Sequence, residues 1–571
     1  MSWGPLLLAP DRTRFALWAP ALDALTLEID GPPPLAMAPA GDGWFAVEAA
    51  CGAGARYRFR LPDGAIVPDP ASRAQDGGVH GWSIVTDPAG YRWQAQEWRG
   101  RPWREAVIHE VHVGAAGGYA GLAEMLPGLA AIGFTAIELM PLAAFGGTRN
   151  WGYDGVLPYA PAASYGTPDD LRALIDAAHG QGLMVLLDVV YNHFGPDGNY
   201  LSAYAPDFFK ADVHTPWGGA IDFGRAPVAQ FFIDNALYWL RDFRFDGLRF
   251  DAVHAIADNA FLDRMAAEIR AGVPDRHIHL VLENEHNDAA RLETSYDAQW
   301  NDDFHNVLHV LLTYETHGYY KDFAEAPAER LARCLAEGFI YQGQGSPNQK
   351  GKPRGSPSGH LPPTRFVSFL QNHDQIGNRA LGERLTLLTS RERLRAATGL
   401  LLLCPQIPLT FMGDETGSES PFLFFTDFHD ELADAVREGR RGEFAGHPGF
   451  ADESARDHIP DPNARTTFDR SRALPGPDAD AWRALYTQLL VLRRERIMPR
   501  LDDAAALGAE AIGAKAVVAR WRIGAEQLTL AINLGDDAVP FAAPEATLLV
   551  AIGAETIDGT LPSASFAAWI A

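Results

Sequence analysis

The chain has 571 residues and a formal net charge of −25. A chain of this length normally divides into more than one domain, and its acidic balance, without any run of Lys or Arg, argues against nucleic acid as a partner. The three cysteines, Cys51, Cys334 and Cys404, lie far apart and form no CxxC pair, which favours a reducing compartment over a disulfide framework or a zinc site.

The N-terminal segment, MSWGPLLLAP, lacks the basic start and the long apolar run of a secretion signal. The sequence also has no uninterrupted apolar stretch of the length that crosses a bilayer. We therefore expect a cytoplasmic protein with no membrane partner.

Residues 1–95 predict a small β-sandwich. Short alternating or β-rich runs are separated by Asp-Gly and Pro clusters, such as Gly31–Pro34, which is the pattern of strands joined by tight turns. The expected strands are Phe15–Ala19, Leu25–Ile29, Trp44–Glu48 and Arg56–Arg60.

Residues 96–495 predict a (β/α)8 barrel, the TIM-barrel fold of the α/β class. Short apolar runs alternate with longer helical stretches, and eight such units indicate a closed parallel sheet. The segment Tyr341–Pro363, rich in Gly, Pro, Ser and Gln, is expected to be a long surface loop. The expected strands are Val107–Val113, Ala136–Met140, Leu183–Val189, Gly247–Asp251, His279–Glu283, Ala298–Trp300, Phe366–Gln371 and Pro408–Met412.

Residues 496–571 predict a C-terminal antiparallel β-domain. Three apolar, β-rich runs return here after the helical pattern ends. They are Ala516–Trp521, Leu528–Asn533 and Thr547–Ala551.

Acidic residues stand at or next to the ends of four predicted barrel strands: Asp188, Asp251, Glu283 and Asp374. Because the carboxyl ends of barrel strands face one another across the top of the barrel, these acids are expected to gather there. A single acid at a strand end is more often a solvated cap or half of an ion pair. Four of them favour glycoside cleavage, which needs two carboxyl groups flanking the bond.

The choice between Glu283 and Glu285 is open from the residues alone. Alternation places both side chains on the same face, and we favour Glu283 because it directly follows the strand. Arg249 shares a face with Asp251 and can keep that carboxylate ionised, although a structural ion pair predicts the same geometry.

His193 and His373 flank the strand-end acids and are candidate donors to sugar hydroxyls. A metal site is not expected, since the sequence contains no HExxH motif and no Cys/His cluster at ligand spacing. Among the aromatic residues near these motifs, Trp151 and Tyr153 are the preferred sugar-stacking candidates, because they stand in the loop Gly146–Gly155. The other aromatic residues are Trp217, Phe223, Trp300, Phe304, Tyr319 and Tyr320, for which core packing is the simpler explanation.

Four segments together resemble the hallmark motifs of the α-amylase superfamily, glycoside hydrolase family 13. They are Asp188–His193, Asp246–Asp251, the stretch that ends at Glu283, and Phe369–Asp374. The resemblance implies a retaining mechanism with Asp251 as nucleophile, Glu283 as general acid/base and Asp374 as a third essential carboxylate. It also implies that four further residues line the subsite where the bond breaks: Tyr153, His193, Arg249 and His373.

A narrower resemblance, covering nearly the whole chain, is to the malto-oligosyltrehalose trehalohydrolases within that superfamily. It is carried by the segments Asp297–His305, Leu370–Arg379, Pro421–Asp427 and Val436–Phe444. It implies hydrolysis of the α-1,4 bond next to a terminal trehalose, a glucan-binding-like N-terminal sandwich, no cofactor, no metal, and action together with a malto-oligosyltrehalose synthase. The further substrate contacts that it implies are His254, Asp303, His305, Gln375 and Asn378.

Three alternatives stay open. A glycogen branching enzyme would use the same acids and pass the glycosyl group to a sugar hydroxyl, and a general α-glucanase would not select trehalose. A non-catalytic glucan-binding protein on the same scaffold would normally have lost one of the acids, and here all are present.

Overall fold

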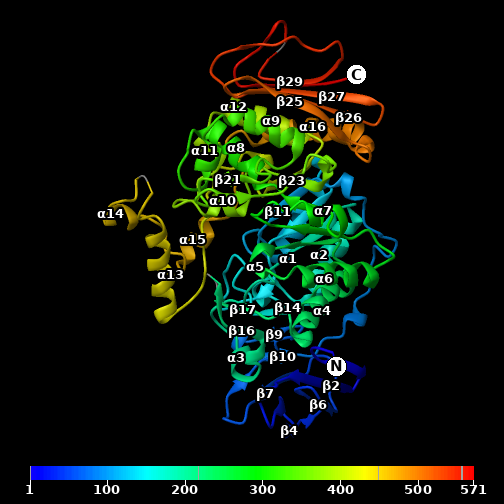
Figure 1. Cartoon of the computed structure of the whole chain (residues 1–571). Coiled ribbons are helices and arrows are strands. Elements are labelled where there is room, and N and C mark those ends of the chain that lie inside the picture. The colour runs from blue at the N-terminus through cyan, green and yellow to red at the C-terminus, as the bar shows by residue number, and fades with distance from the viewer. Residues whose placement is uncertain (1, 216–217, 448, 555–556) are drawn as a thin grey trace.

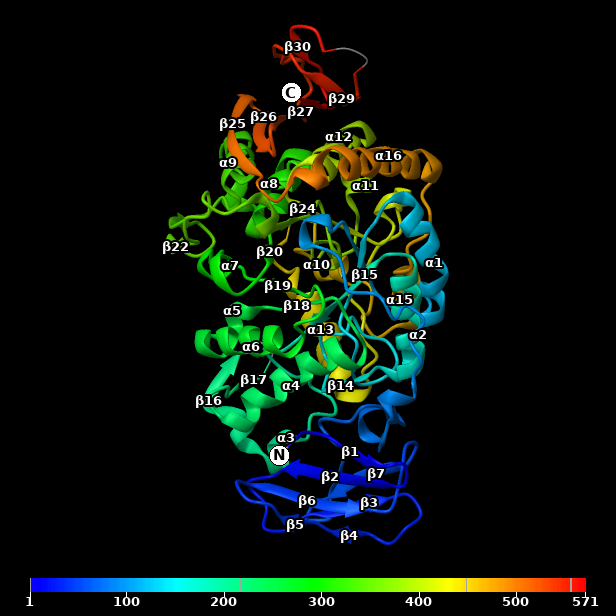
Figure 2. The same cartoon turned by 90° about the vertical axis from the view of Figure 1, so that its right-hand side faces the viewer.

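The structure is a computed structural model, and it describes residues 2–215, 218–447, 449–554 and 557–571. The molecule is elongated: an N-terminal pair of sheets forms one end, the C-terminal sheet forms the other, and a barrel lies between them (Figure 1, Figure 2). None of the helices in the described part of the chain combines the length and the apolar character that crossing a bilayer requires.

The N-terminal region consists of two antiparallel sheets that pack face to face, as predicted. The ring of Phe15 on one sheet lies 4.7 Å from the ring of Tyr57 on the other. Trp3 joins this core to the barrel, because its indole NH donates to the carbonyl of Pro227 at 3.1 Å. The first sheet has the order β1 (Leu6–Ala9), β2 (Arg12–Trp18), β6 (Trp44–Ala49), β5 (Ala38–Pro39), and the second has the order β4 (Leu35–Ala36), β3 (Thr26–Ile29), β7 (Arg56–Arg60), β10 (Trp82–Ile84), β9 (Gln75–Asp76), with β8 (Ile66–Val67) beside β7.

The central sheet is a closed barrel of eight parallel strands, and every predicted barrel strand is confirmed. Several strands are shorter than predicted at the carboxyl end, so Asp251 and Glu283 lie in the first loop positions beyond the ladder. In chain order, which is also the order around the barrel, the strands are β11 (Ile108–Val111), β12 (Ala136–Leu139), β15 (Met184–Val189), β18 (Gly247–Phe250), β19 (His279–Leu282), β20 (Ala298–Trp300), β23 (Phe366–Ser368) and β24 (Ile407–Phe411).

Helices surround the barrel and return the chain from one strand to the next. The start of α2 shows how the sequence sets a helix boundary: Thr167 and Asp170 form a reciprocal capping box that satisfies two free backbone NH groups. The main helices are α1 (Gly118–Ile132), α2 (Pro168–Gly180), α4 (Ala226–Asp242), α6 (Asn259–Gly272), α8 (Asp302–Thr313), α9 (Pro327–Glu337), α12 (Arg391–Leu403) and α16 (Ala479–Leu492).

The expected surface loop Tyr341–Pro363 is only partly irregular, and this corrects the prediction. It contains an antiparallel hairpin of β21 (Gln344–Ser346) and β22 (Lys352–Arg354). The turn between them places Lys350 and Gly351 in the left-handed region, at φ 57° and 81°. The connection spans the five residues between Ser346 and Lys352, a common length for a hairpin loop.

A second excursion from the barrel top carries α13 (Asp430–Glu443), α14 (Glu453–Arg456) and α15 (Arg465–Arg470), which stand to one side in yellow (Figure 1). Arg440 fastens α13 to the barrel, since its guanidinium donates to the carbonyls of Gly377 at 2.7 Å and Arg379 at 2.9 Å. This helix therefore reaches the rim above the strand ends.

The C-terminal sheet has the order β25 (Ala505–Gly513), β26 (Ala516–Ile523), β27 (Glu526–Asn533), β31 (Ser565–Ile570), β29 (Thr547–Ile552). The three predicted strands are confirmed, while β25 and β31 were not predicted. The sequence of β25 is rich in Ala and Gly, which carry little β-propensity. The sheet packs on α9 and α12. The domain boundaries near residues 95 and 495 stay predictions.

Candidate active site

A cavity of about 870 Å³ opens at the carboxyl ends of the barrel strands. This is the end of the fold at which barrel enzymes place their chemistry. All the predicted catalytic and substrate-binding residues except Asp303 and His305 line it. They are Tyr153, His193, Arg249, Asp251, His254, Glu283, His373, Asp374, Gln375 and Asn378.

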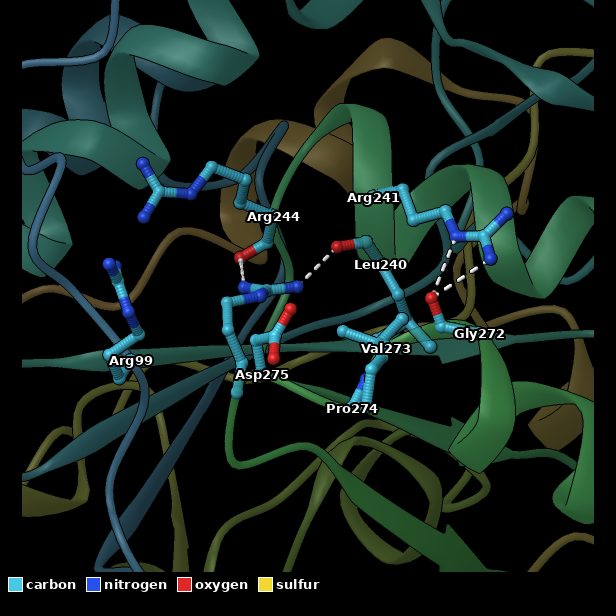
Figure 3. Close-up of a pocket in the computed structure, with 9 residues that line it drawn as sticks. Arg99, Leu240, Arg241, Arg244, Gly272, Val273, Pro274 and Asp275 are labelled. Carbon is cyan, nitrogen blue, oxygen red and sulfur yellow. Dashed lines mark hydrogen bonds between the residues drawn. The ribbon is translucent and has the colours of Figure 1, made fainter.

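A second cavity, of about 710 Å³, lies at the opposite end of the barrel, before strands β18 and β19 (Figure 3). Two of its arginines hydrogen-bond to backbone carbonyls at or just beyond the ends of helices. Arg276 donates to the carbonyl of Arg244 at 3.0 Å, and Arg241 donates to that of Gly272 at 2.9 Å. Asp275 is the one acidic residue that lines it. Because glycoside cleavage needs a facing pair of carboxyl groups, this cavity is not the candidate site.

Arg249 bridges two of the strand-end acids. Its Nη1 lies 2.7 Å from Oδ1 of Asp251 and 2.8 Å from Oδ2 of Asp188, and its guanidinium stacks over Trp300, 4.2 Å from the ring centre. Burial opposes the charge of Arg249, but the two carboxylates raise its pKa well above its ordinary value. A permanent cation therefore stands within hydrogen-bond distance of the carboxyl group of Asp251.

The surroundings of Glu283 shift its pKa upwards. Burial raises the pKa of Glu283 well above its usual range, and the negative charges of Asp251 and Asp302 raise it further, against the opposing charge of Arg249. Its Oε2 accepts a hydrogen bond from the backbone NH of Ala252 at 2.6 Å. The raised pKa of Glu283 favours the protonated form that a general acid requires, and Glu283 lines the same cavity as Asp251.

Glu285 also lines the cavity but is more than half exposed. It contacts His286, with its Oε1 3.6 Å from Nε2 of that residue. Because the side chain of Glu283 is 17% exposed and lies near Arg249, whereas that of Glu285 is 55% exposed, the geometry favours Glu283 as the acid.

Tyr153 and His373 form a buried network under the cavity. The hydroxyl of Tyr153 donates to Asp188 at 2.6 Å and accepts from Nε2 of His373 at 2.8 Å. The other ring nitrogen of His373 lies 2.5 Å from Oε1 of Glu110. Burial opposes the charge of His373, yet the carboxylate of Glu110 raises the pKa of this ring, which favours the form that donates from both nitrogens.

His193 is positioned by the loop that carries Tyr153. Its Nε2 lies 3.0 Å from the carbonyl oxygen of Tyr153, and its Nδ1 lies 3.0 Å from Oδ1 of Asn192. Burial lowers the pKa of His193. His254 lies further out, 5.3 Å from the ring of His286, and burial lowers its pKa as well.

Asp374 belongs to the short helix α10 (His373–Gly377) after strand β23. Asn372 and Gln375 form a capping box at its start, in which Oε1 of Gln375 accepts from the backbone NH of Asn372 at 3.2 Å. Asp374 is exposed to the cavity, and Oδ1 accepts from Nδ2 of Asn378 at 2.7 Å. The helix start therefore presents one solvated carboxylate opposite Asp251 and Glu283.

Comparison with known proteins agrees with this geometry. The alpha-amylase catalytic-domain family model matches residues 72–213. Malto-oligosyltrehalose trehalohydrolases are similar over nearly the whole chain: the protein from Deinococcus radiodurans is 40% identical, with 95% of this chain and 92% of that protein covered. The protein from Saccharolobus solfataricus is 39% identical, with 86% of each covered.

The chain belongs to the malto-oligosyltrehalose trehalohydrolase family. A solved structure from Salmonella typhimurium, described as an alpha amylase, shares this architecture throughout, with a TM-score of 0.94 and 45% identity over 100% of this chain and 99% of that one. A branching enzyme from Burkholderia thailandensis is 34% identical but covers only 42% of this chain, so the trehalohydrolase family is the better match. The C-terminal sheet matches a domain of unknown function over residues 504–567.

Two residues that the trehalohydrolase resemblance implied as substrate contacts lie behind the cavity wall. Asp303 is fully buried and accepts from the backbone NH groups of Ile340 and Tyr341, at 2.8 and 3.2 Å. His305 is held between the carbonyl of Leu370 and the Tyr320 hydroxyl, and burial lowers its pKa to about 3. Both residues support the wall and do not face the cavity.

Several cavity residues were not predicted as contacts. Asp302 was missed because three polar residues in a row follow strand β20, and no periodicity tells which one faces inward. Residues of the hairpin and of α13 were missed because the sequence does not show where these excursions fold back. The unpredicted polar residues are Asp154, Asp302, Asn306, Asp322, Ser346, Asn348, Gln349, Arg354, Asn372, Arg440 and Glu443.

Some of the aromatic candidates line the cavity and others do not. Trp151, Tyr153, Trp300 and Tyr319 line the cavity, together with Phe424. The cavity lining does not include Phe223, Phe304 and Tyr320, and Trp217 lies outside the described residues.

Asp303→Ala is expected to lower the stability of the protein by about 3–5 kcal/mol, because it leaves buried donors and a cation without their acceptor. The cation is Arg354, whose Nη2 lies 3.1 Å from Oδ1 of Asp303. The measurement is the thermal unfolding midpoint of the variant. Asp302→Ala, one residue earlier at the same helix start, is the matched control and is expected to change stability by less than about 1 kcal/mol. Equal midpoints for both variants would contradict the supporting role.

Proposed function

We propose that the chain hydrolyses the α-1,4-glucosidic bond next to the terminal trehalose of malto-oligosyltrehalose, releasing trehalose and a shortened malto-oligosaccharide. The observation that carries the proposal is the near full-length similarity to malto-oligosyltrehalose trehalohydrolases. The cavity supports it chemically, because Asp251 and Glu283 both line it, and Arg249 lies 2.7 Å from the carboxyl group of Asp251 and 3.9 Å from that of Glu283.

The proposed reaction has two steps that retain the anomeric configuration. In the first step, a carboxylate oxygen of Asp251 attacks the anomeric carbon, the bond to the trehalose oxygen breaks, and Glu283 gives that oxygen its proton. A covalent glycosyl ester on Asp251 results. In the second step, Glu283 takes a proton from water, the hydroxide attacks the anomeric carbon, and Asp251 is released as a carboxylate.

The proton cycle of Glu283 follows from its coupling to Asp251. While Asp251 is ionised, its charge helps to raise the pKa of Glu283, so Glu283 holds a proton and acts as an acid. Formation of the ester removes that negative charge. The pKa of Glu283 then falls, because Arg249 still acts on it, and the carboxylate becomes a base for the second step.

The remaining residues are proposed to position the sugar. Asp374 would bind hydroxyl groups of the reacting glucose unit, and the ring of His373, held by Glu110 and Tyr153, would donate a hydrogen bond to a sugar hydroxyl. The other proposed contacts are Tyr153, His193, Arg249, His254, Gln375 and Asn378.

We also propose a division into three domains, 1–95, 96–495 and 496–571, and a place after a malto-oligosyltrehalose synthase. The substrate carries an α,α-1,1 bond at its end, and hydrolysis of an α-1,4 bond does not make that bond. A separate transglycosylating reaction has to supply it. A cytoplasmic location fits this partnership.

Product analysis tests the function directly. The purified protein is incubated with maltotriosyltrehalose and, separately, with maltopentaose, and the products are identified by chromatography. Rapid release of trehalose with slow attack on maltopentaose is the expected result. Equal rates on both substrates would leave a general α-glucanase, and new α-1,6 branches would point to the branching enzyme.

A further inference from the structure

Asp302 presents its carboxyl group to the active-site cavity without a protein partner. It is the first residue of α8 and lies two residues after strand β20. It lines the cavity with Glu283 and Asp374. Within the ranges that the structure describes, no hydrogen bond and no ion pair within 4 Å involves this carboxyl group, whereas its neighbour Asp303 is satisfied by buried donors.

The charges around Asp302 show where it lies in the cavity. Burial and the carboxylate of Asp374 raise the pKa of Asp302 to about 7, against the opposing charge of Arg354. Asp302 in turn raises the pKa of Glu283. The group therefore lies between the general acid and Asp374, in agreement with the place of β20 between β19 and β23 in the barrel.

A carboxyl group in this state suits a sugar hydroxyl. Near neutral pH the protonated and ionised forms of Asp302 are both populated, so the group can donate as well as accept a hydrogen bond. A sugar hydroxyl also does both. When substrate enters the cavity, it removes water from a carboxyl group that has no protein partner. This costs free energy unless the substrate supplies hydrogen bonds in place of the water.

The neighbours of Asp302 point to the leaving-group side of the cavity. Arg354 donates to the carbonyl of Glu285 at 2.8 Å and pairs with Asp303, so hairpin β21–β22 is tied to the loop that follows the general acid. The oxygen that Glu283 protonates belongs to the leaving group. Asp302 also lies outside the four segments that carry the shared carboxylates of the α-amylase superfamily. A contact from Asp302 can therefore be specific to the trehalose unit, which distinguishes the proposed substrate from other α-glucans.

We propose that Asp302 hydrogen-bonds hydroxyl groups of the trehalose unit and thereby helps to select malto-oligosyltrehalose over plain malto-oligosaccharides. This inference rests on the proposed function. A simpler role exists, because an acid in the first turn of any helix interacts favourably with the helix dipole. That role does not depend on which leaving group the substrate carries, and the test uses this difference.

The test compares two substrates with the same glucan part. Maltotriosyltrehalose carries the trehalose unit, and α-maltotriosyl fluoride replaces it with fluoride. Asp302→Ala is expected to lower kcat/KM for maltotriosyltrehalose by on the order of ten- to a hundredfold, the usual effect of losing hydrogen bonds to an ionisable group. Its kcat/KM for the fluoride is expected to stay within about twofold, because no trehalose hydroxyl is present.

Two further variants separate binding from structure. Asp302→Asn keeps a group that both donates and accepts, so it is expected to recover most of the activity on maltotriosyltrehalose. Asp480→Asn removes an exposed first-turn acid from α16, outside the residues that line the cavity, and is expected to leave both substrates unaffected. Circular dichroism and thermal unfolding check that each variant is folded.

The outcomes are distinct. Equal losses on both substrates, or no loss on either, would overturn the inference about Asp302. If the wild-type protein itself released no trehalose from maltotriosyltrehalose, the proposed function would fail first. Trehalose release by the wild type, together with unchanged selectivity in Asp302→Ala, would remove this inference alone.

Discussion

Asp251→Asn is expected to reduce kcat on maltotriosyltrehalose by about 10⁴-fold and to leave the fold intact. The amide keeps the volume of the side chain but lacks the charge that attacks the anomeric carbon. In the wild type, Nη1 of Arg249 lies 2.7 Å from Asp251, so the variant also leaves this cation with one carboxylate, Asp188, in place of two. Steady-state kinetics and a thermal unfolding curve are the measurements, with Asp480→Asn as the control.

The stereochemistry of the product gives an independent check on the same assignment. A glycosyl ester on Asp251 requires that the new reducing end of the released malto-oligosaccharide appears first as the α-anomer. Proton NMR of the early reaction distinguishes it from the β-anomer. Turnover by Asp251→Asn near the wild-type rate, or an initial β-anomer, would exclude Asp251 as the nucleophile.

Glu283→Gln is expected to slow hydrolysis of maltotriosyltrehalose on the order of 10³-fold, because the amide cannot protonate the leaving oxygen of trehalose. The rate of the first step, formation of the glycosyl ester, should fall much less with α-maltotriosyl fluoride, since fluoride leaves without a proton. Added azide should restore turnover and yield α-maltotriosyl azide, because the anion attacks the glycosyl ester without the help of a base. An equal loss of rate on maltotriosyltrehalose and on α-maltotriosyl fluoride would contradict the acid/base role.

The pH profile tests the same group by another property. The folded-state pKa of Glu283 is raised, so its active protonated form is present at low pH and is lost as pH rises through that pKa. The alkaline limb of kcat/KM in the wild type is therefore expected to flatten in Glu283→Gln. Asp302 also titrates, at about 7, so the limb is measured in Asp302→Asn as well, where it should persist. If the alkaline limb of kcat/KM disappeared in Asp302→Asn and persisted in Glu283→Gln, the titrating group would be Asp302.

The barrel could be predicted because its strands are buried on both faces. Such strands are short and continuously apolar, as in Met184–Leu187, and the helices between them carry a different period. The hairpin β21–β22 was not predicted, because Gly, Pro, Ser and Gln give no alternation of apolar and polar residues. It is held by contacts with distant residues, such as that of Arg354 with Glu285.

The sequence by itself predicted that Asp251, Glu283 and Asp374 gather at the carboxyl ends of the barrel strands, since each follows an apolar strand, and the cavity lining brings them together. Only the tertiary structure decided that Asp302 faces the cavity while Asp303 is buried behind it, and that burial raises the pKa of Glu283. The direction of a side chain at a loop-to-helix junction depends on the backbone path, which has no period. The pKa of an acid depends on its burial and on charges that are distant in sequence, and only the folded chain brings these together.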